Sequence, residues 1–288
     1  MNNFLYYIII IPISKLNNFF LYLVSDILYL IIGKLLKYRK PLITKNLEKS
    51  FPKKNENEIK NIRKYFYKHF SDLIVESLKG FTISEKRINK KIKLKNPELL
   101  NEMAQKKQNI VLIGGHYNNW EMSAQKMPLD CEHELFAIYK PLSNKFFDKK
   151  MKDSREKFGL RMISMKETKR YFHTENEKPR GIIFGSDQSP SNTKNAHWIK
   201  FLHQDSGFLF GAEKYAKEFN WPVVFVSIQK INRGSYEVSF ELITDQPKKE
   251  PKGKIIEDFA KLLEADINRN PPYWLWTHNR WKKSKYLF

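Results

Sequence analysis

Two apolar runs in the first 36 residues limit how this chain can fold. They span Phe4 to Ile13 and Phe19 to Leu36, with a mainly polar break at 14–18. A membrane-spanning helix needs about 20 apolar residues, so the first run is too short alone, and the second carries Asp26 and Lys34. We expect a retained membrane anchor that crosses the bilayer once or lies within one leaflet. The alternative is a pair of amphipathic helices buried in an ordinary core.

A basic segment follows the second run and indicates an orientation. Its cations are Lys34, Lys37, Arg39, Lys40 and Lys45. By the positive-inside rule they keep the downstream chain in the cytoplasm. A secretory signal peptide is disfavoured, because no positive charge precedes the first run and no small-residue cleavage site follows. We predict an anchor at residues 1–40 and one catalytic domain at 41–288.

The charge of the chain favours polyanionic partners. It has 52 Lys and Arg against 31 Asp and Glu, a formal net charge of +21. Nucleic acid, an anionic membrane surface, phosphorylated lipids and acidic carrier proteins all match that charge. The lysines are spread along the chain, so a solvated surface accounts for much of the excess. The single cysteine, Cys131, excludes an internal disulfide and fits a cytosolic environment.

Short apolar runs alternate with helical patterns after the anchor. Asn55 and Glu58 form a capping-box pattern that starts a helix, and Gly80 is placed to end it. Strands are predicted at 109–115, 135–139, 161–165, 180–188 and 222–230, with a partner strand after the Arg233-Gly234 turn. Helices are predicted at 120–127, 143–158, from 166 to about 177, at 208–219 and at 255–267. This alternation predicts an α/β fold with a mixed, mostly parallel sheet covered by helices.

One motif carries chemistry: Gly114-Gly115-His116-Tyr117-Asn118-Asn119-Trp120-Glu121. It follows an apolar strand, and open α/β sheets bind ligands at the carboxyl ends of their strands. On one continuous helix, His116 and Glu121 would lie roughly 140° apart, so the segment must turn before a helix starts near Trp120. We predict that Glu121 then hydrogen-bonds the imidazole, leaving His116 as general base. A purely structural histidine is the alternative.

The motif resembles the His-x4-acid motif of the glycerolipid acyltransferase superfamily and, in detail, the lipid A biosynthesis (late) acyltransferase family of Gram-negative bacteria. Further segments resemble family blocks in the same order along the chain. They are Asn46-Leu47 to Phe51-Pro52, Tyr139-Lys140-Pro141, Ser186-Asp187-Gln188, the 201–219 loop entering a helix, and Trp274 to Lys282. Lys140 stands where many members have arginine, and Ser186 where several have proline. These two departures leave the acyl-transfer chemistry unchanged and concern which lipid is the acceptor.

The resemblance implies transfer of a fatty-acyl chain from an acyl thioester to a hydroxyl of a membrane glycolipid, such as a lipid A precursor. The donor is acyl carrier protein or acyl-CoA, and the place is the cytoplasmic face of the inner membrane. His116 and Glu121 are the catalytic candidates; Gly115, Lys140, Asp187 and Arg280 are the substrate-binding candidates. Lys140 and backbone N–H groups near Gly114-Gly115 are candidate oxyanion donors.

Other functions fit the sequence less well. Within the superfamily, the acceptor can instead be an amino-acid lipid or a lysophospholipid. A membrane-tethered nucleic-acid-binding protein matches the charge, but no nucleic-acid-binding motif is present. A metal hydrolase using His116, Glu121 and His133 lacks a recognised ligand spacing. We therefore expect no metal, no cofactor and no nucleic acid.

Overall fold

The computed structural model describes residues 2–174, 177–190, 193 and 196–282. Its centre is a seven-stranded sheet in the order β1-β9-β8-β2-β5-β3-β4, in which only the β8–β9 pair is antiparallel. The predicted mixed, mostly parallel α/β sheet is confirmed. The strands of this sheet are β1 (Ile92–Leu94), β2 (Ile110–Gly114), β3 (Glu134–Tyr139), β4 (Arg161–Ser164), β5 (Arg180–Gly185), β8 (Val223–Asn232) and β9 (Ser235–Thr244).

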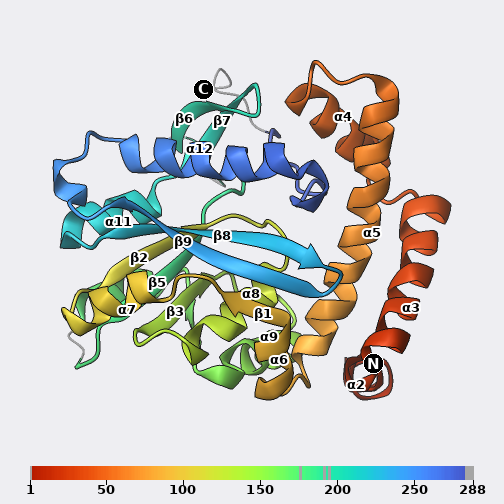
Figure 1. Cartoon of the computed structure of the whole chain (residues 1–288), viewed down its shortest axis with the longest axis horizontal. Helices are drawn as coiled ribbons and strands as arrows, with labels where there is room; N and C mark the ends of the chain where they lie inside the picture. The colour runs from red at the N-terminus through yellow and green to blue at the C-terminus, as the bar shows by residue number, and fades with distance from the viewer. Residues whose placement is uncertain (1, 175–176, 191–192, 194–195, 283–288) are drawn as a thin grey trace.

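Helices precede the sheet and cover it (Figure 1). Those before the first strand are α1 (Asn2–Phe4), η1 (Leu5–Ile10), α2 (Ile11–Lys15), α3 (Asn18–Tyr29), η2 (Leu30–Leu35), α4 (Lys40–Ser50), α5 (Glu56–Gly80) and α6 (Glu85–Lys91). Those that follow are α7 (Glu98–Gln105), α8 (Trp120–Lys126), η3 (Met127–Leu129), α9 (Lys145–Arg155), η4 (Glu156–Phe158), α10 (Thr168–His173), α11 (Gly211–Phe219), η5 (Pro247–Lys249), α12 (Lys254–Arg269) and η6 (Pro271–Tyr273).

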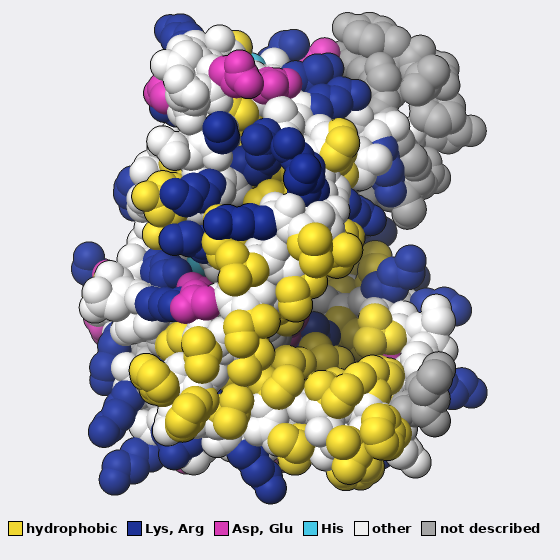
Figure 2. Space-filling view, turned by 90° about the vertical axis from the view of Figure 1, so that its right-hand side faces the viewer, with side chains coloured by type: hydrophobic (Ala, Val, Ile, Leu, Met, Phe, Trp, Pro, Cys, Tyr) yellow, Lys and Arg dark blue, Asp and Glu magenta, His cyan; other side chains and the backbone are white. Residues whose placement is uncertain are grey.

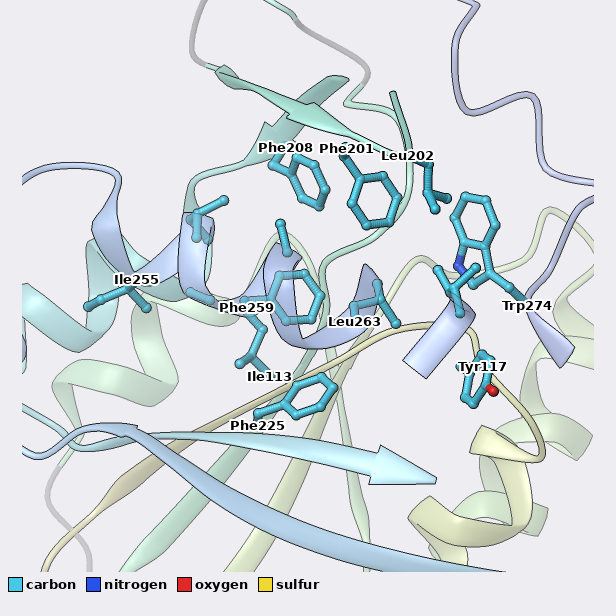
Figure 3. Close-up of a cluster of buried hydrophobic side chains, with 14 of the residues drawn as sticks. Ile113, Tyr117, Phe201, Leu202, Phe208, Phe225, Ile255, Phe259, Leu263 and Trp274 are labelled. Carbon is cyan, nitrogen blue, oxygen red and sulfur yellow. The ribbon is translucent and has the colours of Figure 1, made fainter. Parts of the chain in front are cut away.

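The sheet has a hydrophobic core on each face, because successive side chains of a strand point to opposite sides. In β2, Val111 and Ile113 join one cluster of buried residues, which includes Phe259 of α12. Ile110 and Leu112 join the other, which includes Met122 of α8. Figure 3 shows this first cluster around α12, with Ile113 and Phe225 on the side of the sheet and Phe201 and Phe208 on the other side. Burial on both faces explains why β2 is apolar throughout.

The long helix α5 connects the N-terminal helices to the sheet. The Asn55 side chain accepts a hydrogen bond from the Glu58 N–H, and Glu58 bonds the Asn55 N–H, so the predicted capping box is confirmed, as is the end at Gly80. Figure 1 shows α5 at one end of the sheet with α3 on its outer side. Leu21 and Ser25 of α3 are fully buried against α5. Hence α3 packs on the rest of the chain with one face only.

The other face of α3 is apolar and exposed. Helix Asn18–Leu35 is long and apolar enough to cross a membrane, and only 11% of it is buried. The reading of these runs as a helix pair buried in an ordinary core is therefore wrong. Figure 2 shows the exposed apolar side chains as one band, with a hollow beside it and basic side chains above it. The exposed apolar residues of this region include Phe4, Leu5, Ile8, Ile9, Phe19, Phe20, Leu23, Ile27, Leu30, Ile31, Leu35 and Leu36.

One part of the predicted secondary structure is wrong. Residues 201–210 were expected to be loop and helix, but β6 (Ala196–Phe201) and β7 (Gln204–Leu209) form an antiparallel hairpin, and α11 starts only at Gly211. The hairpin turn, Leu202-His203, has φ angles of 49° and 63°. The helix predicted from 166 to about 177 is α10, and residues 175–176 lie outside the described residues.

Candidate active site

Two neighbouring parallel strands bring His116 and Asp187 together. Strands β2 and β5 are in register from Ile110 with Gly181 to Gly114 with Gly185. The Ser186 N–H donates to the Gly114 carbonyl, which extends this pairing past the strand ends. A Cβ on Gly185 would lie 3.3 Å from the His116 ring, so glycine leaves room for the imidazole. The loops after both strands therefore meet at the carboxyl edge of the sheet.

Asp187 binds His116 through both of its carboxylate oxygens. The His116 Nδ1 lies 2.6 Å from Asp187 Oδ1, and the His116 backbone N–H donates to Oδ2 at 2.9 Å. The indole N–H of Trp274 also donates to Oδ2, at 2.8 Å. Three donors thus surround a carboxylate that is only 2% exposed. Such a set of hydrogen bonds stabilises the ionised form of a buried carboxyl group.

The charges of the pair follow from these contacts. Burial opposes ionisation of Asp187, but His116 and the other donors outweigh it and lower the pKa of Asp187 to about 2. Burial likewise opposes a charged His116, but the Asp187 carboxylate prevails, so the pKa of His116 is raised above its ordinary value. An ionised Asp187 has no proton to donate. The proton between them is therefore on His116 Nδ1.

This tautomer leaves His116 Nε2 with a lone pair. The amide nitrogen of Gln188 lies 3.2 Å from Nε2 and is its donor. The imidazole is 23% exposed, so a ligand can reach it. The ring of Trp120 covers one side at 5.1 Å, edge on. In this arrangement a carboxylate orients the imidazole, whose outer nitrogen is available as a base.

The residues after His116 are held on several sides. Asn118 has the left-handed φ of 52°, and its side-chain amide donates to the Ile228 carbonyl. The Asn119 side-chain oxygen Oδ1 caps α8 by accepting from the Met122 N–H. The Asn119 amide group donates to Glu76 of α5 at 2.6 Å. The predicted turn at Asn118-Asn119 is confirmed, and it fixes the loop to both β8 and α5.

The predicted hydrogen bond between Glu121 and His116 is wrong. Both Glu121 oxygens accept from Arg155 of α9, at 2.8 Å from Nε and 2.5 Å from Nη2. The position of α8 directs Glu121 toward α9, and Asp187 already occupies the imidazole Nδ1. Glu121 still lies close enough to raise the pKa of His116, while Arg155 lowers it. The Glu121–Arg155 pair therefore acts on His116 through its charges.

The C-terminal segment completes the surroundings of Asp187. Trp274 is nearly fully buried, and His278 Nε2 accepts a hydrogen bond from the Ser189 N–H at 3.0 Å. Burial lowers the pKa of His278 to about 4, so this histidine is neutral at pH 7. Arg280 is 2% exposed and lies over the ring of Phe208. Its Nε and Nη2 have no hydrogen-bond acceptor among the described residues, and burial lowers the pKa of Arg280 to about 10.

The remaining predicted residues lie at the same edge of the sheet. Lys140 is exposed directly after β3, the neighbour of β5. A Cβ on Gly115 would lie 2.7 Å from Leu263 of α12, so this glycine allows close helix packing. The sequence did not identify Gln188, Arg155 or His278 as site residues. Within the described part of the chain, no group of three His, Cys, Asp or Glu side chains is placed to hold a metal ion.

Comparison with known proteins identifies the family. The model of the bacterial lipid A biosynthesis acyltransferase family matches residues 1–283. The chain belongs to this family. A lipid A biosynthesis acyltransferase of Haemophilus influenzae is 22% identical over 85% of this chain and 78% of its own length. A lipid A biosynthesis palmitoleoyltransferase of Escherichia coli is 20% identical over 86% of this chain and 80% of its own length. The chain is thus an acyltransferase of the lipid A biosynthesis acyltransferase family, and the sequence resemblance is confirmed.

Proposed function

We propose that this acyltransferase moves a fatty-acyl group from an acyl thioester to a hydroxyl group of a lipid A precursor, with His116 as general base. One observation carries the proposal: Asp187 holds His116 Nδ1, so the lone pair is on Nε2 of a partly exposed imidazole, where it accepts from the Gln188 amide. The names of the relatives support lipid A as the acceptor. The site residues supply a base, and direct attack by the acceptor hydroxyl needs no nucleophilic side chain of the protein.

The reaction proceeds by direct attack of the acceptor hydroxyl on the thioester carbonyl carbon. His116 Nε2 takes the hydroxyl proton as the C–O bond forms. The resulting imidazolium is stabilised by the buried Asp187 carboxylate. The C–S bond then breaks, and the thiolate takes the proton from Nε2, so His116 returns to its starting state. Lys140 and the backbone N–H groups near Gly114-Gly115 are the proposed donors to the oxyanion.

The charged neighbours have separate proposed roles. Glu121 holds Arg155 beside His116 and balances the positive charge of Arg155. Arg280 has buried N–H groups without an acceptor among the described residues, which suits binding of an anionic group of the substrate. The donor we propose is acyl carrier protein, because its acidic surface complements a chain of +21 net charge. Acyl-CoA is the alternative donor.

The enzyme is proposed to lie on the cytoplasmic face of the inner membrane, with the exposed face of α3 in one leaflet. The ion pair between Asp26 of α3 and Arg233 of the β8–β9 turn is partly exposed. A charged pair and a sheet turn do not suit the hydrocarbon core, where lipid-exposed irregular backbone is not found. A helix that lies in the membrane interface with its apolar side toward the lipid leaves both the ion pair and the β8–β9 turn outside the hydrocarbon core. This favours the one-leaflet arrangement over a full span.

The test is transfer by the purified full-length enzyme. We expect acyl carrier protein loaded with a fatty acid, together with a lipid A precursor, to give a product heavier by one acyl chain in mass spectrometry. His116→Ala should fold normally and reduce turnover by about 10²- to 10⁴-fold, the usual contribution of a positioned base. Near-normal turnover by His116→Ala would reject the mechanism. Acylation of a lysophospholipid or an amino-acid lipid, with none of the lipid A precursor, would reject the acceptor.

A further inference from the structure

A concave site lies away from the catalytic loops, between η2 and α5. This basic groove has a volume of about 570 Å³. Its cationic lining residues are Lys34, Lys37, Lys40, Lys60, Arg63 and Lys64, and its other lining residues are Tyr29, Gly33, Asn57, Asn61 and Tyr67. No carboxylate lines the groove. None of its six cations forms an ion pair with a carboxylate of the described residues.

The turn between η2 and α4, which carries Lys37, is held in an uncommon conformation. Lys37 and Arg39 both have positive φ, 47° and 51°, which costs a non-glycine residue on the order of 1 kcal/mol. Hydrogen bonds from three elements keep it in place. The Tyr67 hydroxyl of α5 donates to the Tyr38 carbonyl at 2.7 Å, and Arg39 donates to the Thr277 carbonyl at 2.8 Å. The Tyr38 N–H donates a hydrogen bond to the carbonyl of Ile32 in η2. The fold therefore holds together lysines whose positive charges repel one another.

The basic groove adjoins the apolar band. Leu35 and Leu36, the last residues of that band, are 75% and 65% exposed and immediately precede Lys37. In Figure 2 the basic side chains lie directly above the apolar ones. With the apolar face of α3 among acyl chains, the groove is at the depth of the lipid phosphates. Basic pockets beside membrane helices recognise anionic headgroups through this geometry.

The groove is distant from the reacting groups. Its lining on α5 runs from Asn57 to Tyr67, whereas the catalytic loop bonds α5 at Glu76. Along a helix with a rise of 1.5 Å per residue, Tyr67 and Glu76 are about 14 Å apart. None of its lining residues belongs to the loops around His116, Asp187 or Trp274. A headgroup bound in the groove therefore lies outside the loops that carry the reacting side chains.

We propose that the basic groove binds the phosphate headgroup of an anionic phospholipid of the membrane, separate from donor and acceptor. The proposal rests on the membrane arrangement proposed above. The ammonium groups face the phosphate, and the amides of Asn57 and Asn61 face the polar headgroup beyond it. Bound in this way, the phospholipid anchors α3 and α5 at a fixed depth.

The first test measures binding without turnover. Full-length enzyme is floated with phosphatidylcholine vesicles that contain 0% or about 30% phosphatidylglycerol. The triple variant Lys37→Gln, Lys60→Gln, Lys64→Gln is compared with Lys86→Gln, Lys106→Gln, Lys248→Gln, which removes equal charge from exposed lysines elsewhere. We expect the groove variant to lose about 10- to 100-fold in affinity for the anionic vesicles, and the control less than about threefold. Equal losses, or none, would overturn the proposal.

Two further arms separate the possible ligands. Inorganic phosphate at millimolar concentration should not displace the vesicles; if it does, a free phosphate ion is the ligand. In phospholipid-free detergent, the groove variant should keep the normal KM for acceptor and for acyl carrier protein. A raised KM for the acceptor would assign the groove to the acceptor's phosphates, and a raised KM for the carrier protein would make it a carrier docking site. Either result would overturn the proposal. Since vesicle binding needs no turnover, its result does not depend on whether the proposed His116 mechanism is correct.

Discussion

The hydroxyl group of Tyr22 in α3 donates a 2.8 Å hydrogen bond to Glu76 Oε1, a carboxylate fully buried in α5. The other oxygen of Glu76 accepts from Asn119 in the catalytic loop and from Tyr236 in β9. Nearby, Ser25 of α3 donates to Asp72. Glu76 therefore connects the proposed anchor to the loop that carries His116. The division into an anchor at 1–40 and a domain at 41–288 cuts through these buried contacts.

The first prediction concerns Tyr22. Tyr22→Phe removes one donor from a buried carboxylate and should lower the free energy of unfolding by about 1 to 3 kcal/mol. Chemical denaturation in detergent measures this, with Tyr7→Phe as control, because Tyr7 is 53% exposed. Deletion of residues 1–39 should lower the melting temperature further, since it also uncovers Asp72. A truncated protein as stable as the full chain would contradict this role for α3.

The second prediction concerns the pH dependence of turnover. The reacting form of His116 is neutral, so turnover should rise as pH increases through the pKa of His116, which lies above its ordinary value. Asp187→Asn removes the charge that raises this pKa, so the midpoint should move to lower pH. Turnover should also fall by about 10²- to 10⁴-fold, because an amide does not fix the reactive tautomer. A pH–rate profile of both proteins is the measurement. An unchanged midpoint would show that Asp187 does not set the basicity of His116.

The third prediction separates Glu121 from Arg155. Glu121 raises the pKa of His116 and Arg155 lowers it. Glu121→Gln should therefore move the acidic limb of the pH–rate profile to lower pH, and Arg155→Met should move it to higher pH. In the double variant the shifts should largely cancel. Shifts in the same direction would mean that the pair acts through the position of α8 and α9 rather than through charge.

The fourth prediction concerns the donor. Lys145 and Lys149 are exposed on α9, the helix that carries Arg155. Lys145→Glu with Lys149→Glu should raise the KM for acyl carrier protein about 3- to 10-fold with little change in kcat. Salt should weaken the effect, since the Debye length falls from about 10 Å at 0.1 M to about 3 Å at 1 M. Acyl-CoA should respond less. The control is Lys106→Glu with Lys248→Glu. Equal effects on both donors would remove the carrier-protein assignment.

Local signals in the sequence were sufficient for much of the fold. The apolar run of β2 and the capping box at Asn55 each depend on neighbouring residues alone, so both were predictable. The hairpin of β6 and β7 was not. Its turn places Leu202 and His203 at positive φ, where two-residue hairpin turns normally carry Asn or Gly. Tertiary packing, with Phe201 and Phe208 buried against α12, overrides the local preference there.

The partner of His116 shows the limit of spacing as evidence. The five-residue interval to Glu121 pointed to a local pair, but the carboxylate that binds the ring is 71 residues away. The β2–β5 register decides this contact, and pairing of parallel strands separated by other strands is not visible in one sequence. Asp187 was a candidate because of its motif, and its role as the orienting carboxylate follows only from the sheet.

The contacts of Glu76 also fix the order in which the enzyme can be completed during translation. Tyr22 leaves the ribosome before Glu76, but Tyr236 follows Glu76 by 160 residues. At roughly 5 to 20 residues per second this delay is about 8 to 32 s. Trp274, which binds Asp187, emerges later still. The catalytic centre is therefore complete only after nearly the whole chain, from Tyr22 to Trp274, has left the ribosome.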